Sequence, residues 1–119
     1  MYKKIEATEI EGGLRLLPDE QIELAFKFEA ADNKRRENDK LYFTNKRVIR
    51  LQGADYQSVP YGNIIYYAVG ARGGDLSLSP GVTINLPGES HASRLRLTMD
   101  TKYLIDVEYL LARHVFKYC

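Results

Sequence analysis

The strongest constraint on this chain is a change in the spacing of its apolar residues at Asp100. Before that position, short segments alternate apolar and polar side chains, and a period of two is typical of strands with one buried face. From Lys102 to Lys117 the apolar residues recur at helical spacing. Asp100 or Thr101 can cap the first turn, because a short side-chain oxygen accepts free backbone N–H groups there. The sequence therefore predicts strands followed by one C-terminal helix.

The alternating segments are short and are separated by turn-forming residues. Ile22 to Glu29 shows the clearest alternation, and Thr44-Asn45-Lys46-Arg47 indicates a hairpin turn because asparagine tolerates left-handed backbone. Further strands are predicted at 41–43, 48–51, 56–59, 64–69, 76–78, 82–86 and 95–99. We expect a mainly β domain of about seven antiparallel strands, arranged as a barrel or sandwich and capped by a C-terminal α-helix.

Length and composition indicate one domain. The 119 residues and an apolar fraction of 45% suit a single core, so we expect one domain over 1–119. Its parts would be a short helix or extended segment at 1–17, strands over 18–100 and a closing helix at 101–118. No apolar run is long enough for a membrane span or a signal peptide, and Cys119 is the one cysteine. These features predict a cytoplasmic protein.

The predicted helix carries two apolar strips. One consists of Leu104, Val107, Leu111 and Val115, and the other of Ile105, Tyr109, Ala112 and Phe116. One strip suffices to cover a β core, so the second has two explanations. A curved sheet could wrap around the helix and cover both, or the second strip could contact another subunit. On the second explanation, Ile105, Tyr109 and Phe116 are a candidate homo-oligomer interface.

Three stretches carry a resemblance to a known family. They are Leu17-Pro-Asp-Glu-Gln-Ile-Glu, Leu41-Tyr-Phe-Thr-Asn-Lys-Arg-Val-Ile and Ser58-Val-Pro-Tyr-Gly-Asn-Ile. The chain resembles the bacterial pleckstrin-homology-like (PH-like) domains, which have an acidic residue before the first strand, a Phe-Thr-Asn-Lys-Arg hairpin and a Ser-x-Pro-Tyr-x-x-Ile step. The resemblance covers about residues 14–118. It implies a strongly bent seven-stranded antiparallel sheet closed by the helix, no catalytic residues, and a tendency to form homo-oligomers.

The chain departs from that family in two places. The loop at 31–39 is longer than is usual between the first two strands, and the stretch around Gly73-Gly74-Asp75-Leu76 lacks a run of acidic residues. The longer loop could add a binding surface. The missing acidic run leaves the family's oligomer geometry open for this chain.

Basic residues gather around that loop. The candidate anion-binding residues are Lys34, Arg35, Arg36 and Lys40, with Lys46 and Arg47 on the next hairpin. Eukaryotic pleckstrin-homology domains use basic residues around the same loop to hold inositol phosphates, and arginine forks match phosphate oxygens. Against this, residues 32–40 carry four basic and three acidic side chains, a mixture that is typical of a solvated loop. Arg47 could instead pair with Asp39 or Glu37, or pack against Tyr42.

Catalytic and metal-binding patterns are weak. His91 lies beside Glu89 and Ser90, but neighbours on one loop rarely supply the geometry of a nucleophile, its base and an orienting group. His114 is interpreted as a surface or capping residue near the helix end. No cysteine pair, no histidine pair at helical spacing and no run of alternating aspartates indicates a metal site. We therefore expect no enzyme activity, catalytic residue, metal or cofactor.

Charge and aromatic content favour a binding role. The formal charge is +1, from 17 basic and 16 acidic residues, so we expect no nucleic-acid partner. Tyr56, Tyr61, Tyr66 and Tyr67 cluster around Pro60, and tyrosine suits protein interfaces. We predict a non-catalytic binding and assembly module that self-associates and engages a protein partner through a sheet edge and surface aromatics. The alternative is a binder of phosphoinositide-like headgroups or an acidic lipid surface through the basic loops.

Overall fold

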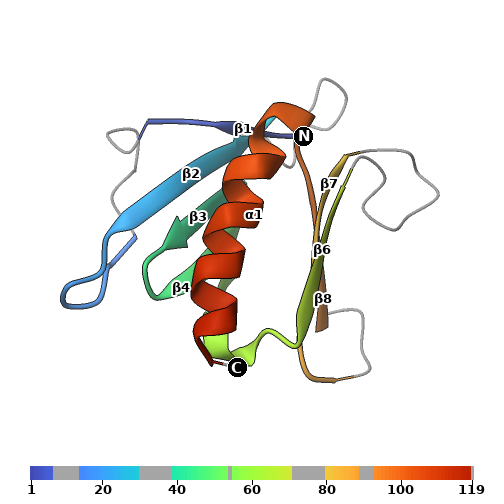
Figure 1. Ribbon diagram of the computed structural model, residues 1–119. Coiled ribbons are helices and arrows are strands. Elements are labelled where there is room, and N and C mark those ends of the chain that lie inside the picture. Colours follow the sequence, from blue (N-terminus) through green and yellow to red (C-terminus); the bar gives the residue numbers. More distant parts are fainter. Residues whose placement is uncertain (7–13, 30–38, 54, 71–79, 89–92, 119) are drawn as a thin grey trace. The chain divides into compact units, whose positions relative to one another are not determined.

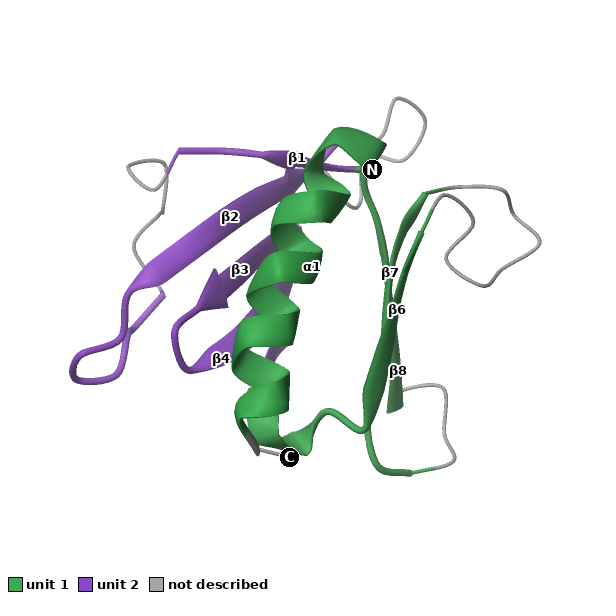
Figure 2. Cartoon of the chain, viewed as in Figure 1, with its two compact units in different colours: residues 1, 60–119 green, residues 2–59 purple. Residues whose placement is uncertain are grey.

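A computed structural model of the chain describes residues 1–6, 14–29, 39–53, 55–70, 80–88 and 93–118 (Figure 1). These ranges form two antiparallel sheets and one C-terminal helix. The backbone groups into two compact units (Figure 2). The N-terminal unit is Tyr2–Val59, and the C-terminal unit is Pro60–Cys119 together with Met1.

The N-terminal unit contains a five-stranded sheet whose strands follow sequence order. Its strands are β1 (Tyr2–Lys4), β2 (Ile22–Phe28), β3 (Lys40–Thr44), β4 (Arg47–Gln52) and β5 (Asp55–Pro60). β3 is buried along its whole length. Ala25, Tyr42 and Ile49 form a buried cluster, and the ring of Phe26 meets that of Phe43 edge-on at 6.0 Å between centroids. The predicted hairpin at residues 41–51 is therefore the β3–β4 pair at the centre of this sheet.

β1 was not predicted as a strand. The structure pairs Tyr2–Lys4 with the end of β2, where the sequence indicated only a short helix or extended segment. Tyr2 is fully buried, and its ring contacts Phe28 edge-on at 5.1 Å between centroids. Three residues are too few to display a period of two, so no local pattern predicts β1. Its position follows from pairing with β2 and from the contact between Tyr2 and Phe28.

The C-terminal unit contains a three-stranded antiparallel sheet in the order β6-β7-β8. Its strands are β6 (Tyr66–Gly70), β7 (Gly81–Asn85) and β8 (Arg94–Thr98). The central strand β7 is buried throughout. A Cβ atom at Gly81 would collide with the backbone carbonyl of Leu97, so glycine lets β7 begin close to β8.

Helix α1 (Thr101–Val115) begins where the sequence predicted. The Asp100 side chain accepts a hydrogen bond from the backbone N–H of Lys102 at 3.2 Å, which caps the first turn. α1 packs against β6, β7 and the short 3₁₀ helix η3 (Tyr61–Asn63), and it continues into η5 (Phe116–Tyr118). The predicted inner strip is buried, and its members are Leu104, Val107, Leu111 and Val115.

The predicted fold class is confirmed, with one correction. The chain is mainly β with one C-terminal helix, and β2 to β8 correspond to predicted strands. The predicted strand at 76–78 lies outside the described residues. Neither sheet closes into a barrel in the described ranges, because each retains two edge strands. The expectation of a single domain over 1–119 stays a prediction, and no helix within the described ranges is long and apolar enough to cross a bilayer.

Candidate functional site

An apolar groove with a volume of about 700 Å³ lies within the C-terminal unit. One wall comes from η3, the residues after it and β6. The other comes from α1 and the first residue of η5. Ligand sites in proteins commonly have volumes of ~300–1,000 Å³, so this groove has the size of a binding site.

The groove exists because two apolar surfaces meet at an edge strand. In β6, Tyr67 is half-buried and its ring lies 5.9 Å from that of Phe116, whereas Tyr66 on the opposite face is exposed. The second helix strip contributes Ile105 and Phe116 to the other wall.

Much of the lining is open to solvent. Ile65 is 61% exposed, Ile105 79% and Phe116 59%. Large apolar side chains gathered on one exposed surface are typical of an interaction site. Because three of the four members of the second strip are exposed and Ala112 is half-buried, a wrapped sheet does not cover this strip. Tyr109, the third predicted interface residue, is also exposed, but it does not line the groove, and the Arg113 guanidinium lies 5.7 Å from its ring.

A polar pair interrupts the apolar lining. The Tyr67 hydroxyl is hydrogen-bonded to Glu108 of α1. Burial raises the pKa of the Tyr67 hydroxyl to about 12, and the hydrogen bond and negative charge of Glu108 contribute to the same shift. The hydroxyl therefore stays protonated at neutral pH and remains a donor to the carboxylate.

A stacked ring pair holds one end of the groove. Tyr61 of η3 is buried, and its ring lies parallel to the imidazole of His114, with centroids 4.7 Å apart and an interplanar angle of 15°. This contact fixes η3 against the last turn of α1. His114 is therefore half-buried in a structural contact, whereas the sequence indicated a surface or capping residue.

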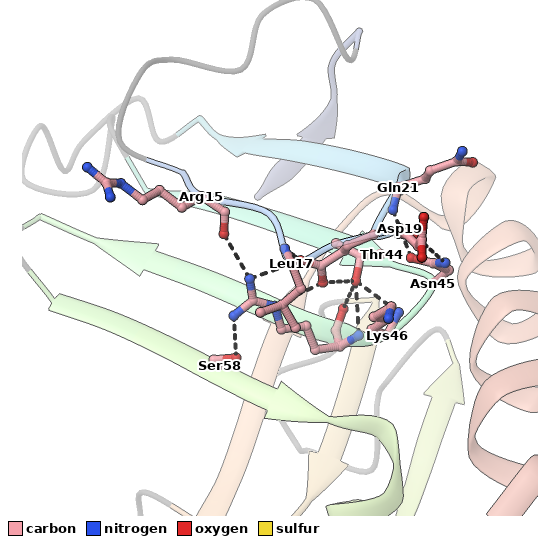
Figure 3. Close-up of polar contacts among 10 residues, drawn as sticks. Arg15, Leu17, Asp19, Gln21, Thr44, Asn45, Lys46 and Ser58 are labelled. Carbon is pink, nitrogen blue, oxygen red and sulfur yellow. Dashed lines mark hydrogen bonds and ion pairs between the residues drawn. The ribbon is translucent and has the colours of Figure 1, made fainter.

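A second polar site, in the N-terminal unit, centres on Glu20. The Glu20 cluster consists of Glu20 and the two side chains that donate to its carboxylate, Thr44 and Arg47. Figure 3 labels Thr44 and residues around the cluster. Arg47 donates to both carboxylate oxygens of Glu20, from Nε at 2.9 Å and from Nη2 at 3.0 Å. Thr44 Oγ1 donates to the same carboxylate at 2.7 Å, and the backbone N–H of Leu17 donates at 2.8 Å. Burial alone would raise the pKa of Glu20, but the hydrogen bonds from Arg47, Thr44 and Leu17 outweigh it and hold the pKa below its ordinary value.

The Glu20 cluster joins the three stretches that carry the family resemblance. Arg47 Nη1 also donates to Ser58 Oγ at 3.1 Å, so the hairpin is tied to the start of the Ser58-Val-Pro-Tyr step. Asn45 receives a hydrogen bond from the Gln21 N–H at 2.8 Å and donates to the Asp19 carbonyl at 3.1 Å. Asp19 adopts a φ of 62°, which lets Glu20 N–H close the turn onto the Leu17 carbonyl. Hydrogen bonds between these three stretches thus connect segments of the N-terminal unit that are far apart in sequence.

Comparison with solved structures identifies the fold. A DUF1696-family protein with a pleckstrin-homology domain from Shewanella loihica aligns with a TM-score of 0.61 and 23% identity, over 84% of this chain and 83% of that chain. The Vps36 N-terminal PH domain aligns with a TM-score of 0.61 and 13% identity, over 87% and 84%. The pleckstrin-homology domain from Shewanella amazonensis gives 0.57 and 23%, over 85% and 88%. The chain has a pleckstrin-homology-like fold. No protein-family model and no curated protein matches the sequence.

Only part of the anion site predicted for this PH-like chain lies within the described residues. Lys34, Arg35 and Arg36 lie outside those residues, as do Ser90 and His91. Lys40 is buried on β3, and Lys46 is exposed in the β3–β4 turn. Arg47 beside it is held by Glu20, a partner that the sequence did not indicate. Binding of anionic headgroups by these six residues stays a prediction.

Sequence reasoning missed the groove, although the PH-like chain carries two signals of it. Ile64 and Ile65 are adjacent, so a strand-like segment cannot bury both, and Ile65 is the exposed one. Glu108 lies between Val107 and Tyr109, which belong to the two apolar strips of α1. An acidic side chain beside both strips is the second signal. No group of three or more histidine, cysteine or acidic side chains within the described ranges could hold a metal ion.

Proposed function

We propose that this PH-like protein is a non-catalytic binding module that holds an extended segment of a partner protein in the groove between β6 and α1. The observation that carries this proposal is the open apolar groove beside an edge strand. A PH-like fold supports a binding role in general.

An extended segment fits the chemistry of both walls. Within the described ranges, β6 pairs with β7 and with no second strand, so its outer edge can accept another strand. Backbone hydrogen bonds to such an edge give affinity, and pockets for alternate side chains give specificity. On an added strand every second side chain would face α1, where Ile105 and Phe116 supply apolar contact.

Self-association is a second candidate, favoured by the exposure of Ile105, Tyr109 and Phe116. Two of these residues line the groove, so a homo-oligomer formed through them would compete with a bound segment. The two roles therefore differ in what covers the same side chains.

Selection from random peptides long enough to span a strand tests the proposed function. Peptides selected on the wild-type protein are expected to lose binding to Ile105→Asp, because a charge would replace exposed apolar contact. Leu16→Asp is the matched control, since Leu16 is an exposed apolar residue of the N-terminal unit. N-methylation of alternate peptide amides should also abolish binding. Peptides that bind both variants equally well would contradict the groove as the site.

A further inference from the structure

The groove contains an acidic side chain, and no basic residue is among the described residues that line it. Glu108 is the one charged residue among the described residues that line the groove. Three and four positions away along α1 lie Leu104, Ile105, Leu111 and Ala112, all apolar. No lysine or arginine of α1 is therefore spaced to form an ion pair with it.

The hydrogen bond from Tyr67 orients the carboxylate without cancelling its charge. The Tyr67 hydroxyl stays neutral, so it contributes a donor and no positive charge. Glu108 is exposed in the described structure, and water can solvate its charge there. A segment that covers the groove removes that water, and a covered carboxylate is costly unless a cation replaces the lost solvation.

The aromatic lining favours one kind of cation. Tyr67 joins the carboxylate to the aromatic surface, because it is hydrogen-bonded to Glu108 and its ring contacts Phe116. A guanidinium can donate two hydrogen bonds to a carboxylate and also stack on aromatic faces, whereas an ammonium is a more strongly hydrated point charge.

We infer that the bound segment carries an arginine or lysine that pairs with Glu108, with apolar side chains two residues before and after it. This inference rests on the proposed function. The spacing follows from the strand, because side chains two residues apart lie on the same face. The preferred partner pattern is apolar-x-basic-x-apolar, with arginine favoured over lysine, and acidic segments are excluded by repulsion.

Charge-swapped variants test the inference directly. The same random peptides are selected on the wild type, Glu108→Gln, Glu108→Lys and Asp106→Lys. Asp106→Lys is the matched control, because Asp106 is an exposed acidic residue of α1 outside the groove lining and the change in charge is the same. Circular dichroism establishes that each variant is folded.

We expect the wild type and Asp106→Lys to select the basic pattern. Their peptides should bind Glu108→Gln about tenfold more weakly, and Glu108→Lys should select aspartate or glutamate at the central position.

The remaining outcomes distinguish a failure of this inference from a failure of the proposed function. Peptides that require Ile105 but show no basic preference would overturn the inference and leave the groove as a peptide site. Failure to recover peptides that depend on Ile105 would overturn both. A dimer that Ile105→Asp abolishes, seen by sedimentation, would assign the groove to a second copy and also overturn the inference.

Discussion

Arg47 and Glu20, 27 residues apart in sequence, form a two-point ion pair in which Nε and Nη2 of the guanidinium meet the two carboxylate oxygens at 2.9 and 3.0 Å. The Glu20 side chain is fully buried and that of Arg47 is 13% exposed. The pair therefore stabilises the fold through hydrogen bonds that are shielded from water. A surface salt bridge such as that between Lys3 and Glu29 contributes little to stability.

Removing Arg47 should leave a buried carboxylate without its cation. We expect Arg47→Leu to lower the free energy of unfolding by about 3 kcal/mol, because an uncompensated buried charge is strongly destabilising. Urea denaturation measures the change. Lys46→Leu is the control on the same turn, and it should stay within about 0.5 kcal/mol of wild type because Lys46 is exposed. Equal losses in both variants would contradict a special role for Arg47.

The Glu20 carboxylate should make stability depend on acidic pH. Its folded-state pKa lies below the ordinary value of 4.5, so the unfolded chain binds more protons in the interval between the two values. The stabilisation is complete above pH 4.5 and is lost as the pH falls through the folded-state pKa. We expect the stability difference between wild type and Glu20→Gln to shrink on acidification from neutral pH. A difference that is constant with pH would count against this linkage.

Thr44 should matter for its hydroxyl and not for its size. Thr44 Oγ1 donates to Glu20 and accepts from the backbone N–H groups of Lys46 and Arg47 at 3.0 and 2.9 Å. Thr44→Val keeps the shape but removes one donor to Glu20 and the acceptor of these two backbone N–H groups, so we expect a loss of about 2 kcal/mol. Thr44→Ser retains the hydroxyl and should lose less. The reverse order, measured by urea denaturation, would show that the methyl group dominates.

Tyr67 should titrate later than an ordinary tyrosine. Its pKa is raised to about 12 by burial first and by Glu108 second, so one Cζ signal in tyrosine-labelled NMR spectra should shift near that pH. The signal should be missing in Tyr67→Phe. In Glu108→Gln its midpoint should fall yet stay above 10, because burial remains. A titration midpoint that is the same in wild type and Glu108→Gln would show that Glu108 does not influence the pKa of Tyr67.

Self-association has its own signature. If the exposed strip of α1 joins subunits, the wild type should sediment as an oligomer at micromolar concentration and Phe116→Glu should lower the mass. Lys117→Glu, the next residue and also exposed, is the control for added charge. A monomeric wild type would remove this candidate and leave the segment-binding role intact.

Local patterns in the sequence predicted most of the strands and the helix. Contacts between residues far apart in sequence could not be predicted from such patterns. The alternation from Ile22 to Phe28 and the helical spacing after Asp100 appear as β2 and α1 because each pattern repeats over several residues. β1 has too few residues for a pattern. The Glu20–Arg47 pair joins residues far apart in sequence, and no charge spacing reveals such a contact.

The groove was hidden for a related reason. Ile105 and Phe116 were identified as surplus apolar residues of the helix, but the other wall of the groove comes from β6, and Tyr67, which contacts Phe116, lies 49 residues before it. Periodicity assigns a face to each element and does not say which faces meet. The exposed position of Ile65 could have been inferred from its neighbour Ile64, whereas the hydrogen bond between Tyr67 and Glu108 could not.

The Glu20 cluster and its hydrogen-bond partners lie between residues 15 and 58, whereas the described residues that line the groove lie between 61 and 116. Under the proposed function, substitutions that change which segment is bound would fall on positions that the polar cluster does not use. Such a domain could then exchange one partner for another without losing the contacts that hold its N-terminal sheet.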